Sequence, residues 1–315
     1  MEHLVHARAV ALGHALDRST QISYSSHLQS YLTFCKIHNF PIEPTADTLS
    51  FYTVFMCHHI KPDSVDSYLS GICNQLEHLY PNVRTIRKAP LVTRTLAGCK
   101  RLLNTPPCRK QPLALEHLAR LLNHFPPSSH DNLLFRSILL SGFFALHRLG
   151  ELTWPDKVEL RSWRKVIKRA SVSFYTGAYG YVLPTSKSDA TFQSATIIIE
   201  EGENDSIQPL TTFKEYLRSR DHIFPFHSAL WITTSGAVPT RAWFLAKLRT
   251  VFPTSSNIGG HSLRSGGATH FAIVGWPDDR IQALGRWSSD AFKIYIRKHP
   301  VVLQALLNNR VVQQL

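Results

Sequence analysis

The chain has 315 residues, of which 43% are hydrophobic and 18% are charged, and its formal net charge is +13. This length allows two domains with cores of their own, and the composition is that of a soluble globular protein. The positive surplus indicates a polyanionic partner, with nucleic acid the first candidate, although a basic protein without such a partner has the same charge.

Cysteine content and hydropathy exclude several other classes of protein. The five cysteines are odd in number and form no C-x-x-C pair, which argues against a disulfide framework or a zinc ribbon and favours a reducing intracellular compartment. Charged residues and histidines interrupt the N-terminal stretch, so we expect no secretory signal there. The most apolar stretch, LLFRSILLSGFFAL from Leu133, is broken by Arg136 and is too short to span a bilayer. We therefore expect a buried helix there and no membrane partner.

Residues 1–108 are expected to form a helical domain. Apolar residues recur at helical spacing in YSSHLQSYLTFCKIH and SVDSYLSGICNQLEHLY, and prolines separate such segments. A run without acidic residues follows, and it contains eight basic ones: Arg84, Arg87, Lys88, Arg94, Lys100, Arg101, Arg109 and Lys110. Such a run is usually a solvated face, but this one leads into TPPCRKQPL, whose composition indicates an interdomain linker. A basic helix beside a linker is well placed to bind DNA phosphates.

Residues 113–315 are expected to form a second, mostly helical domain. Helices are predicted in ALEHLARLLNHF and DNLLFRSILLSGFFAL. The β-branched and aromatic residues of ASVSFY, YGYVLP and SATIIIE then predict a small antiparallel sheet, and helices resume at Leu210. The fold class predicted for the whole chain is mainly α with one small antiparallel sheet.

A segment near the C-terminus combines several reactive side chains. His261 and Arg264 are three residues apart, so they share one face of a helix. Gly259 and Gly260 would let the backbone approach a ligand just before that helix. A tyrosine, Tyr295, follows farther along the chain. Taken singly, a histidine or tyrosine of this kind is more often a cap or a core residue.

Glycine and proline divide this segment into short helices. Gly275 followed by Pro277 indicates that one helix stops and another starts, and Gly285 is expected to close the second. Ser288 or Ser289 can cap the next helix, which carries the tyrosine.

In combination these residues resemble the C-terminal motif of the tyrosine recombinase, or phage integrase-like, family. That family has H-x-x-R, then His or Trp, then a nucleophilic tyrosine, and the resemblance assigns these positions to His261, Arg264, Trp287 and Tyr295. The segment GRWSSDAFKIYIR is most similar to the Crypton-like branch of eukaryotic mobile-element enzymes, and this resemblance implies a nuclear location.

Two upstream segments continue the resemblance in the family's order. FFALHRLGELTWPD resembles the first arginine box, which assigns Arg148 and, three residues later, Glu151. LPTSKSD resembles the β-hairpin that presents a mobile lysine, here Lys187. The sequence departs from the family at Ala145, where a glycine is common, and at His147, where an apolar residue is common.

The resemblance covers nearly all of residues 113–315, which would form the tyrosine recombinase catalytic domain. Residues 1–108 match the family's core-binding, SAM-like DNA-binding domain in size and helical character.

The resemblance implies a reaction on a DNA phosphodiester. The Tyr295 phenol would attack the phosphorus, form a 3′-phosphotyrosine and release a 5′-hydroxyl, which Lys187 would protonate as general acid. Arg148 and Arg264 would donate to the phosphate oxygens, on which negative charge grows.

Three further residues would support this reaction. Trp287 would add a neutral indole N–H, and His261 would donate to the phosphate or accept the tyrosine proton. Glu151 would orient Arg148 or His261. Because the phosphotyrosine keeps the bond energy, the resemblance implies no metal, ATP or other small-molecule cofactor.

Alternative functions remain open from the sequence. A type IB topoisomerase-like enzyme would use the same groups, and a domesticated DNA-binding protein would keep the fold without recombining. A zinc hydrolase is remote because Cys57-His58-His59 lacks the usual ligand spacing. The intact set of family residues favours a recombinase.

The expected partners are double-stranded DNA and further copies of the chain, gathered as a tetramer on DNA. From Pro300 onward the sequence has an apolar stripe of Val302, Leu303, Leu306 and Leu307. This stripe either packs on its own domain or docks on a neighbouring protomer.

Overall fold

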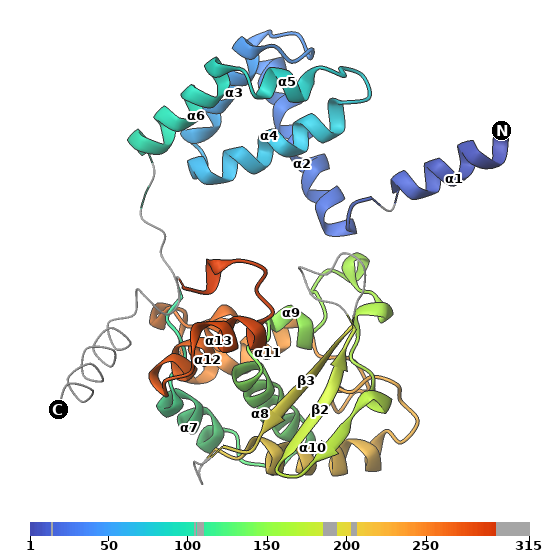
Figure 1. Ribbon diagram of the computed structural model, residues 1–315, viewed down its shortest axis with the longest axis vertical. Helices are drawn as coiled ribbons and strands as arrows, with labels where there is room; N and C mark the ends of the chain where they lie inside the picture. Colours follow the sequence, from blue (N-terminus) through green and yellow to red (C-terminus); the bar gives the residue numbers. More distant parts are fainter. Residues whose placement is uncertain (14, 104, 106–109, 185–193, 203–206, 294–315) are drawn as a thin grey trace. The chain divides into compact units, whose positions relative to one another are not determined.

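The structure is a computed structural model that describes residues 1–13, 15–103, 105, 110–184, 194–202 and 207–293. The chain divides into two compact units, Met1–Cys108 and Arg109–Leu315 (Figure 1).

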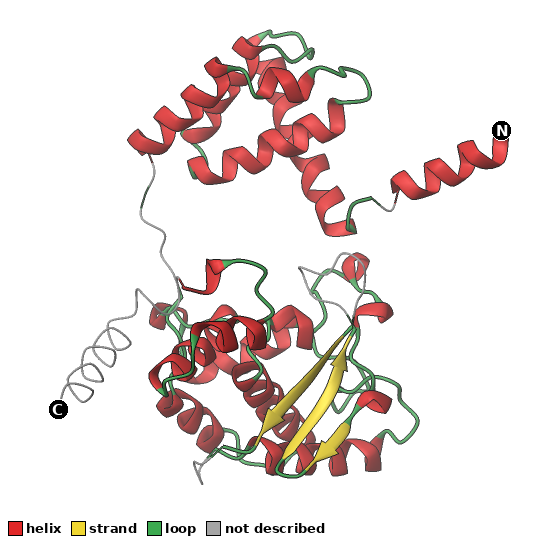
Figure 2. Ribbon diagram, in the orientation of Figure 1, coloured by secondary structure: helices red, strands yellow, loops and turns green. Residues whose placement is uncertain are grey.

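The described part of the first unit contains helices and no strand (Figure 2). Helix α2 packs against α4, and α3 packs against α6, around a core that includes Tyr31, Leu49 and Ile72. Thr45 and Thr48 begin α3 with a capping box, in which each hydroxyl accepts the other residue's backbone N–H. The helices are α1 (Glu2–Gly13), α2 (Arg18–His38), α3 (Ala46–Cys57), α4 (Pro62–Leu76), α5 (Val83–Arg87) and α6 (Pro90–Leu103).

The second unit combines helices with one small sheet, as the sequence predicts. Its α-helices are α7 (Leu115–His124), α8 (His130–Phe144), α9 (Leu149–Leu152), α10 (Pro209–Ile223), α11 (Arg241–Val251), α12 (His261–Ile273) and α13 (Asp278–Gly285). Short 3-10 helices are η1 (Val158–Leu160), η2 (Trp163–Lys165), η3 (Arg169–Ser171), η4 (Thr254–Ser256) and η5 (Asp290–Phe292).

The sheet has the antiparallel order β1 (Ser173–Tyr175), β2 (Ala178–Leu183), β3 (Ala195–Glu200). Tyr179 and Tyr181 of β2 lie two residues apart, both are buried, and they pair with Ile199 and Ile197 of β3. Tyr179 stacks on Phe213 of α10 with ring centroids 4.0 Å apart. The predicted fold class, mainly α with a small antiparallel sheet, is confirmed.

Helix α8 is the centre of the second unit and is buried over most of its surface, as expected of a helix that is apolar on all sides. No helix in the described part of the chain is long and apolar enough to cross a bilayer.

Helix α12 packs very closely on α8 and on the segment before α7 because it contains two successive glycines. A Cβ at Gly266 would lie 2.3 Å from the Leu113 carbonyl oxygen, and one at Gly267 would lie 2.1 Å from the Phe143 carbonyl oxygen. Glycine inside a helix costs roughly 1 kcal/mol relative to alanine, and here the close approach of two backbones offsets that cost.

We expect Gly267→Ala to destabilise the second unit, because the added methyl group would meet backbone that cannot rotate away. Overpacking of this kind costs about 1–3 kcal/mol. All six tryptophans lie in the second unit, so tryptophan fluorescence during thermal unfolding measures this unit selectively.

Gly150→Ala is the matched control, since no heavy atom lies within 4 Å of a Cβ added at that position of α9. It should leave the unfolding temperature unchanged or raise it slightly. Equal unfolding temperatures for the two variants would contradict the close packing of α12 on α8.

Candidate functional site

Three separate segments bring the predicted site residues together. Arg148 precedes α9, His261 and Arg264 lie on the first turn of α12, and Trp287 follows α13. Helix α12 packs on both α8 and α13, and α9 packs on the end of α8, so these elements form one region of the second unit (Figure 1).

Arg148 and Glu151 contact each other across the first turn of α9. The Glu151 carboxylate accepts the backbone N–H of Arg148 at 3.1 Å and its Nη1 at 3.0 Å. A carboxylate at this position also satisfies one of the amide groups that a helix start leaves unpaired. Glu151 therefore orients Arg148, whose side chain stays 28% exposed.

Arg264 is buried, with 1% of its surface exposed. Its Nη1 donates to the Leu146 carbonyl oxygen at 2.5 Å, and its Nη2 donates to the Gly285 carbonyl oxygen. The Trp287 ring covers the guanidinium, with 4.0 Å from Cζ to the ring centroid, which is a cation–π arrangement. Arg264 is thus held between the turn before Arg148 and the turn before Trp287.

His261 is the exposed member of the group. Partial loss of hydration lowers the pKa of its imidazole, and the positive charges of Arg264, Arg148 and Arg241 lower the pKa further. Arg264 follows His261 by one turn on α12, and its hydrogen bond to the Leu146 carbonyl oxygen brings the turn before Arg148 to the same region. Arg241, exposed at the start of α11, was not identified from the sequence because no family motif surrounds it.

Two residues other than glycine adopt left-handed backbone at this site: Leu146 with φ 51° and Arg286 with φ 54°. This conformation costs roughly 1–2 kcal/mol for a residue with a Cβ. Ala145, where a glycine is common in the family, has φ −99°, and Leu146 takes the left-handed position. Helix α13 ends at Gly285, as the sequence predicts, and the left-handed cap that follows it is Arg286.

The glycines of the site have a different purpose, which is close packing. A Cβ at Gly285 would lie 1.6 Å from Cζ3 of Trp287, so the indole lies directly on the backbone. A Cβ at Gly260 would lie 2.6 Å from Cδ2 of Leu149. Gly260 therefore lets α12 begin against Leu149 of α9.

His147 is fully buried and joins the sheet to the site. Its Nδ1 lies 2.9 Å from Glu151 Oε2, and its Nε2 lies 2.8 Å from the Tyr181 hydroxyl. Burial lowers the pKa of His147 to about 4 despite the hydrogen bond to Glu151, so the ring is neutral at pH 7. We assign the tautomer from the network: Nδ1–H donates to Glu151, and Tyr181 donates to Nε2.

Glu151 stays ionised although it is buried. Burial acts to raise the pKa of its carboxyl group, but the hydrogen bond from His147 and the charges of Arg286 and Arg148 hold the pKa well below its usual value. Arg286 Nη2 donates to Glu151 Oε2 at 3.1 Å. His147, Tyr181 and Arg286 were not predicted as site residues.

Two predicted catalytic residues lie outside the described residues. Lys187 belongs to residues 185–193, between β2 and β3, and Tyr295 belongs to residues 294–315. Their assignments remain predictions from the sequence.

Several solved structures share this fold. The lambda integrase dimer bound to a COC′ core site has a TM-score of 0.59 at 14% identity, over 93% of this chain and 93% of that chain. The Tn1549 transposon integrase in complex with transposon right end DNA has a TM-score of 0.60 at 12% identity, again over 93% of each chain. The XerH site-specific recombinase bound to a palindromic difH substrate has a TM-score of 0.58 at 14% identity, over 88% of this chain and 74% of that chain.

The chain has the tyrosine recombinase fold. No protein-family model and no curated protein sequence matches the chain, so the similarity is one of structure.

The basic run of the first unit is partly neutralised by helix α4 and the residue that follows it. Ion pairs join Arg84 to Glu77 at 2.6 Å, Arg87 to Asp66 at 2.9 Å and Lys100 to Asp63 at 3.1 Å.

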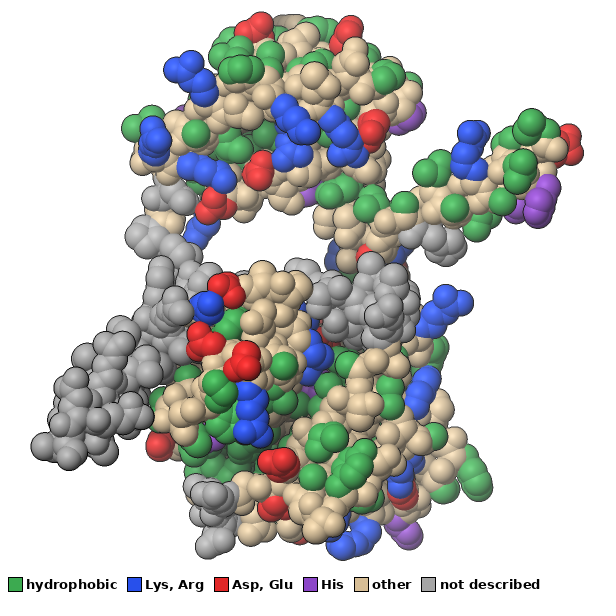
Figure 3. Space-filling model, in the orientation of Figure 1, with side chains coloured by type: hydrophobic (Ala, Val, Ile, Leu, Met, Phe, Trp, Pro, Cys, Tyr) green, Lys and Arg blue, Asp and Glu red, His purple; other side chains and the backbone are tan. Residues whose placement is uncertain are grey.

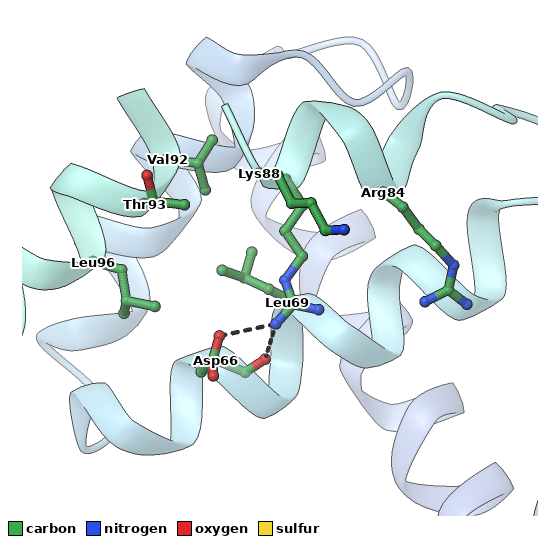
Figure 4. A pocket seen from close by; sticks show the side chains of 8 residues that line it. Asp66, Leu69, Arg84, Lys88, Val92, Thr93 and Leu96 are labelled. Atoms are coloured by element: carbon green, nitrogen blue, oxygen red, sulfur yellow. Dashed lines mark hydrogen bonds and ion pairs between the residues drawn. The ribbon is translucent and has the colours of Figure 1, made fainter. Parts of the chain in front are cut away.

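Arg84 and Arg87 border a hollow of about 360 Å³, and Figure 4 shows Leu69, Val92 and Leu96 as its apolar lining with Asp66 and Lys88 beside them. In Figure 3 Lys and Arg side chains gather on one face of this unit.

The remaining members of the run differ in their surroundings. Lys88, Arg94 and Arg101 are exposed and make no ion pair with the residues described. Lys110 belongs to the second unit and donates to Asn257 at 3.0 Å, whereas Arg109 lies outside the described residues. Among the described members of the run, these three exposed side chains have charge left for a phosphate backbone, as does Lys110, whose partner is a neutral amide.

We expect His147→Gln to flatten the pH dependence of stability. The folded-state pKa of His147, about 4, lies below the usual 6.5. Protonation thus favours the unfolded chain, and stability is lost as pH falls from about 6.5 toward 4. The slope of this contribution is at most about 1.4 kcal/mol per pH unit. Urea unfolding followed by tryptophan fluorescence across this range measures it.

The free-energy difference between the wild type and His147→Gln should shrink as pH falls below 6.5. Protonation of the Glu151 carboxyl also lowers stability, but only below its ordinary pKa near 4.5. The change in stability between about pH 6.5 and 5 therefore reports on the His147 imidazole. If the free energies of unfolding of the wild type and His147→Gln differ by a constant amount between pH 7 and 5, His147 is not held neutral.

Proposed function

We propose that the chain is a site-specific DNA recombinase that cleaves and rejoins strands through a 3′-phosphotyrosine on Tyr295. One observation supports this most: Arg148, His261, Arg264 and Trp287 come from separate segments and lie around one position of a tyrosine recombinase fold. Among the structural neighbours, XerH is bound to its difH substrate in a post-cleavage complex.

The charges of the site suit a phosphodiester. Arg148 and Arg286 both bind the Glu151 carboxylate, and Arg264 and Arg241 add further positive charge at His261, so positive charge is in excess. Donors that are already held in place stabilise a transition state more strongly than mobile ones, each by roughly 3–4 kcal/mol. Arg148 would contact the phosphate first, because its side chain is partly exposed and Arg264 is covered by Trp287.

His261 would accept the proton of the nucleophile. Because its pKa is below the usual value, the imidazole is largely neutral at pH 7 and has a lone pair available. Tyr295 follows the described chain by two residues, and the buried Phe292 packs against Trp287 with ring centroids 5.6 Å apart. Lys187 would protonate the leaving 5′-oxygen.

DNA contacts of the first unit would be electrostatic in large part. Lys88, Arg94 and Arg101 would bind backbone phosphates, which attract cations whatever the base sequence. A nuclear location and the Crypton-like branch remain predictions from the sequence resemblance.

The decisive experiment is covalent trapping on DNA. We expect the wild type to form a denaturation-resistant adduct with duplexes that are randomised around a nick, because the nick lets the released strand diffuse away. Mass spectrometry should place the DNA on Tyr295, and Tyr295→Phe should form no adduct. Arg148→Ala should slow adduct formation by about 10²–10³-fold.

Tyr175→Phe is the matched control, since this tyrosine lies exposed on the short strand β1. It should react like the wild type. DNA binding without any adduct across the whole pool would leave a DNA-binding module and refute the enzyme. Adducts that relax supercoiled DNA but never exchange strands between two duplexes would indicate the topoisomerase-like alternative.

We also propose that copies of the chain gather on DNA through residues 301–315. The lambda integrase neighbour forms a tetramer bound to a Holliday junction. A groove of about 720 Å³ on the second unit offers a docking surface, lined by Phe144, Ile198, Phe271, Val274 and Trp276 among others. Its occupant would be the apolar stripe of a neighbouring copy.

Val274→Asp and Ile198→Asp test this docking, because both side chains are exposed in the groove. Each variant, like deletion of residues 301–315, should cleave DNA yet form no higher-order complex in analytical ultracentrifugation. Phe226→Asp is the control, since Phe226 is 99% exposed and lies outside the groove. If the deletion instead unfolds the free protein, the stripe belongs to its own domain and docking between copies is wrong.

A further inference from the structure

Arg286 stands between Gly285 and Trp287 in a backbone conformation that glycine would adopt without cost. Its φ is 54°, and its side chain is 13% exposed. If the turn were the only requirement, glycine would form it at a lower backbone cost. The contacts of the arginine side chain must therefore stabilise the structure by more than the left-handed turn costs.

Arg286 and Arg264 bind the same two turns, at neighbouring carbonyl groups in each turn. Nη1 of Arg286 lies 3.3 Å from the Ala145 carbonyl oxygen and 3.0 Å from that of Leu284. Arg264 binds the next residue of each turn, Leu146 and Gly285. The two guanidinium groups thus join the end of α8 to the end of α13.

Arg286 also shares the Glu151 carboxylate with Arg148. Oε2 accepts from Arg286 Nη2, from the Arg148 backbone N–H and from His147. Oε1 accepts from Arg148 Nη1, which is the one side-chain hydrogen bond of Arg148 among the residues described. Glu151 therefore holds the Arg148 guanidinium by a single oxygen.

We propose that Arg286 is a positioning residue that keeps the Arg148 guanidinium available to the DNA phosphate while it fixes the turn that carries Trp287. This inference rests on the proposed function. Together with His147 and the Arg148 backbone N–H, Arg286 occupies Oε2. Glu151 therefore does not bind the Arg148 guanidinium through both oxygens, the geometry that a carboxylate and a guanidinium favour. Because the same side chain fixes the turn before Trp287, the segment that leads to Tyr295 and the Arg148 box adopt their geometry together.

Without Arg286, the buried carboxylate would lack one cation and would draw Arg148 into a two-pronged pair. A guanidinium held in that way has fewer N–H groups for the phosphate. The loss would appear in the cleavage step more than in DNA affinity, because the cations proposed to bind the DNA backbone, Lys88, Arg94 and Arg101, belong to the first unit.

Arg286→Gly removes the side chain and keeps the left-handed turn. We expect it to lower the single-turnover rate of adduct formation by about 10–100-fold, as small displacements of reacting groups do, with little change in DNA affinity. Arg286→Lys keeps the charge but cannot contact both turns and Glu151 at once, so its rate should be intermediate. Arg218→Ala, on the exposed face of α10, controls for the loss of one positive charge.

A second substitution separates positioning from simple structural support. Glu151→Gln alone should slow cleavage, but in the Arg286→Gly background it should restore part of the rate, because a neutral amide cannot trap Arg148. If Arg286→Gly does not fold, the same comparison is made with Arg286→Lys.

If the rate losses of Arg286→Gly and Glu151→Gln simply multiply in the double variant, the inference is wrong. A wild-type cleavage rate for Arg286→Gly would also overturn it. Neither result would contradict the proposed function. A wild type that forms no adduct would instead refute the proposed function.

Discussion

The site depends on one buried carboxylate, that of Glu151. A buried carboxylate without partners would cost several kcal/mol, so the surrounding elements are held where their donors can reach it. Arg148 comes from the start of α9, His147 from the turn before it, and Arg286 from the end of α13. Through His147 the network extends to Tyr181 of the sheet. A single negative charge thus connects the helical part of the second unit to its strands and leaves the cations in excess.

Close packing of backbone makes this convergence possible. Gly267 brings α12 against α8, and Gly266 brings it against Leu113. Gly260 brings the start of α12 against Leu149, and Gly285 lets the Trp287 ring lie on the chain. Of these glycines, Gly260 and Gly285 contact the site directly, and the two successive glycines of α12 do not. Together they set the separation of the two turns between which Arg264 is held.

The sequence was sufficient to predict the elements but not the contacts between them. β-branched runs gave the three strands within a few residues, and motif order grouped Arg148 with His261 and Arg264. Left-handed backbone at Leu146 and Arg286 could not be predicted, since propensity assigns it to glycine and tertiary contacts override propensity here. The ion pairs of the basic run were equally hidden, because their acidic partners lie on or just after α4, separated in sequence from the run.

Arg264 is held by main-chain oxygens of Leu146 and Gly285. A carbonyl group is present whatever side chain the residue bears, so the position of Arg264 is encoded by the path of the chain and not by the chemistry of its neighbours. Such a site tolerates many replacements in the two turns, provided that they fit the space. It cannot tolerate a change in their length, because insertion or deletion of one residue would turn both acceptors away. Divergence of this chain should therefore have preserved the spacing of the turns more strictly than their composition.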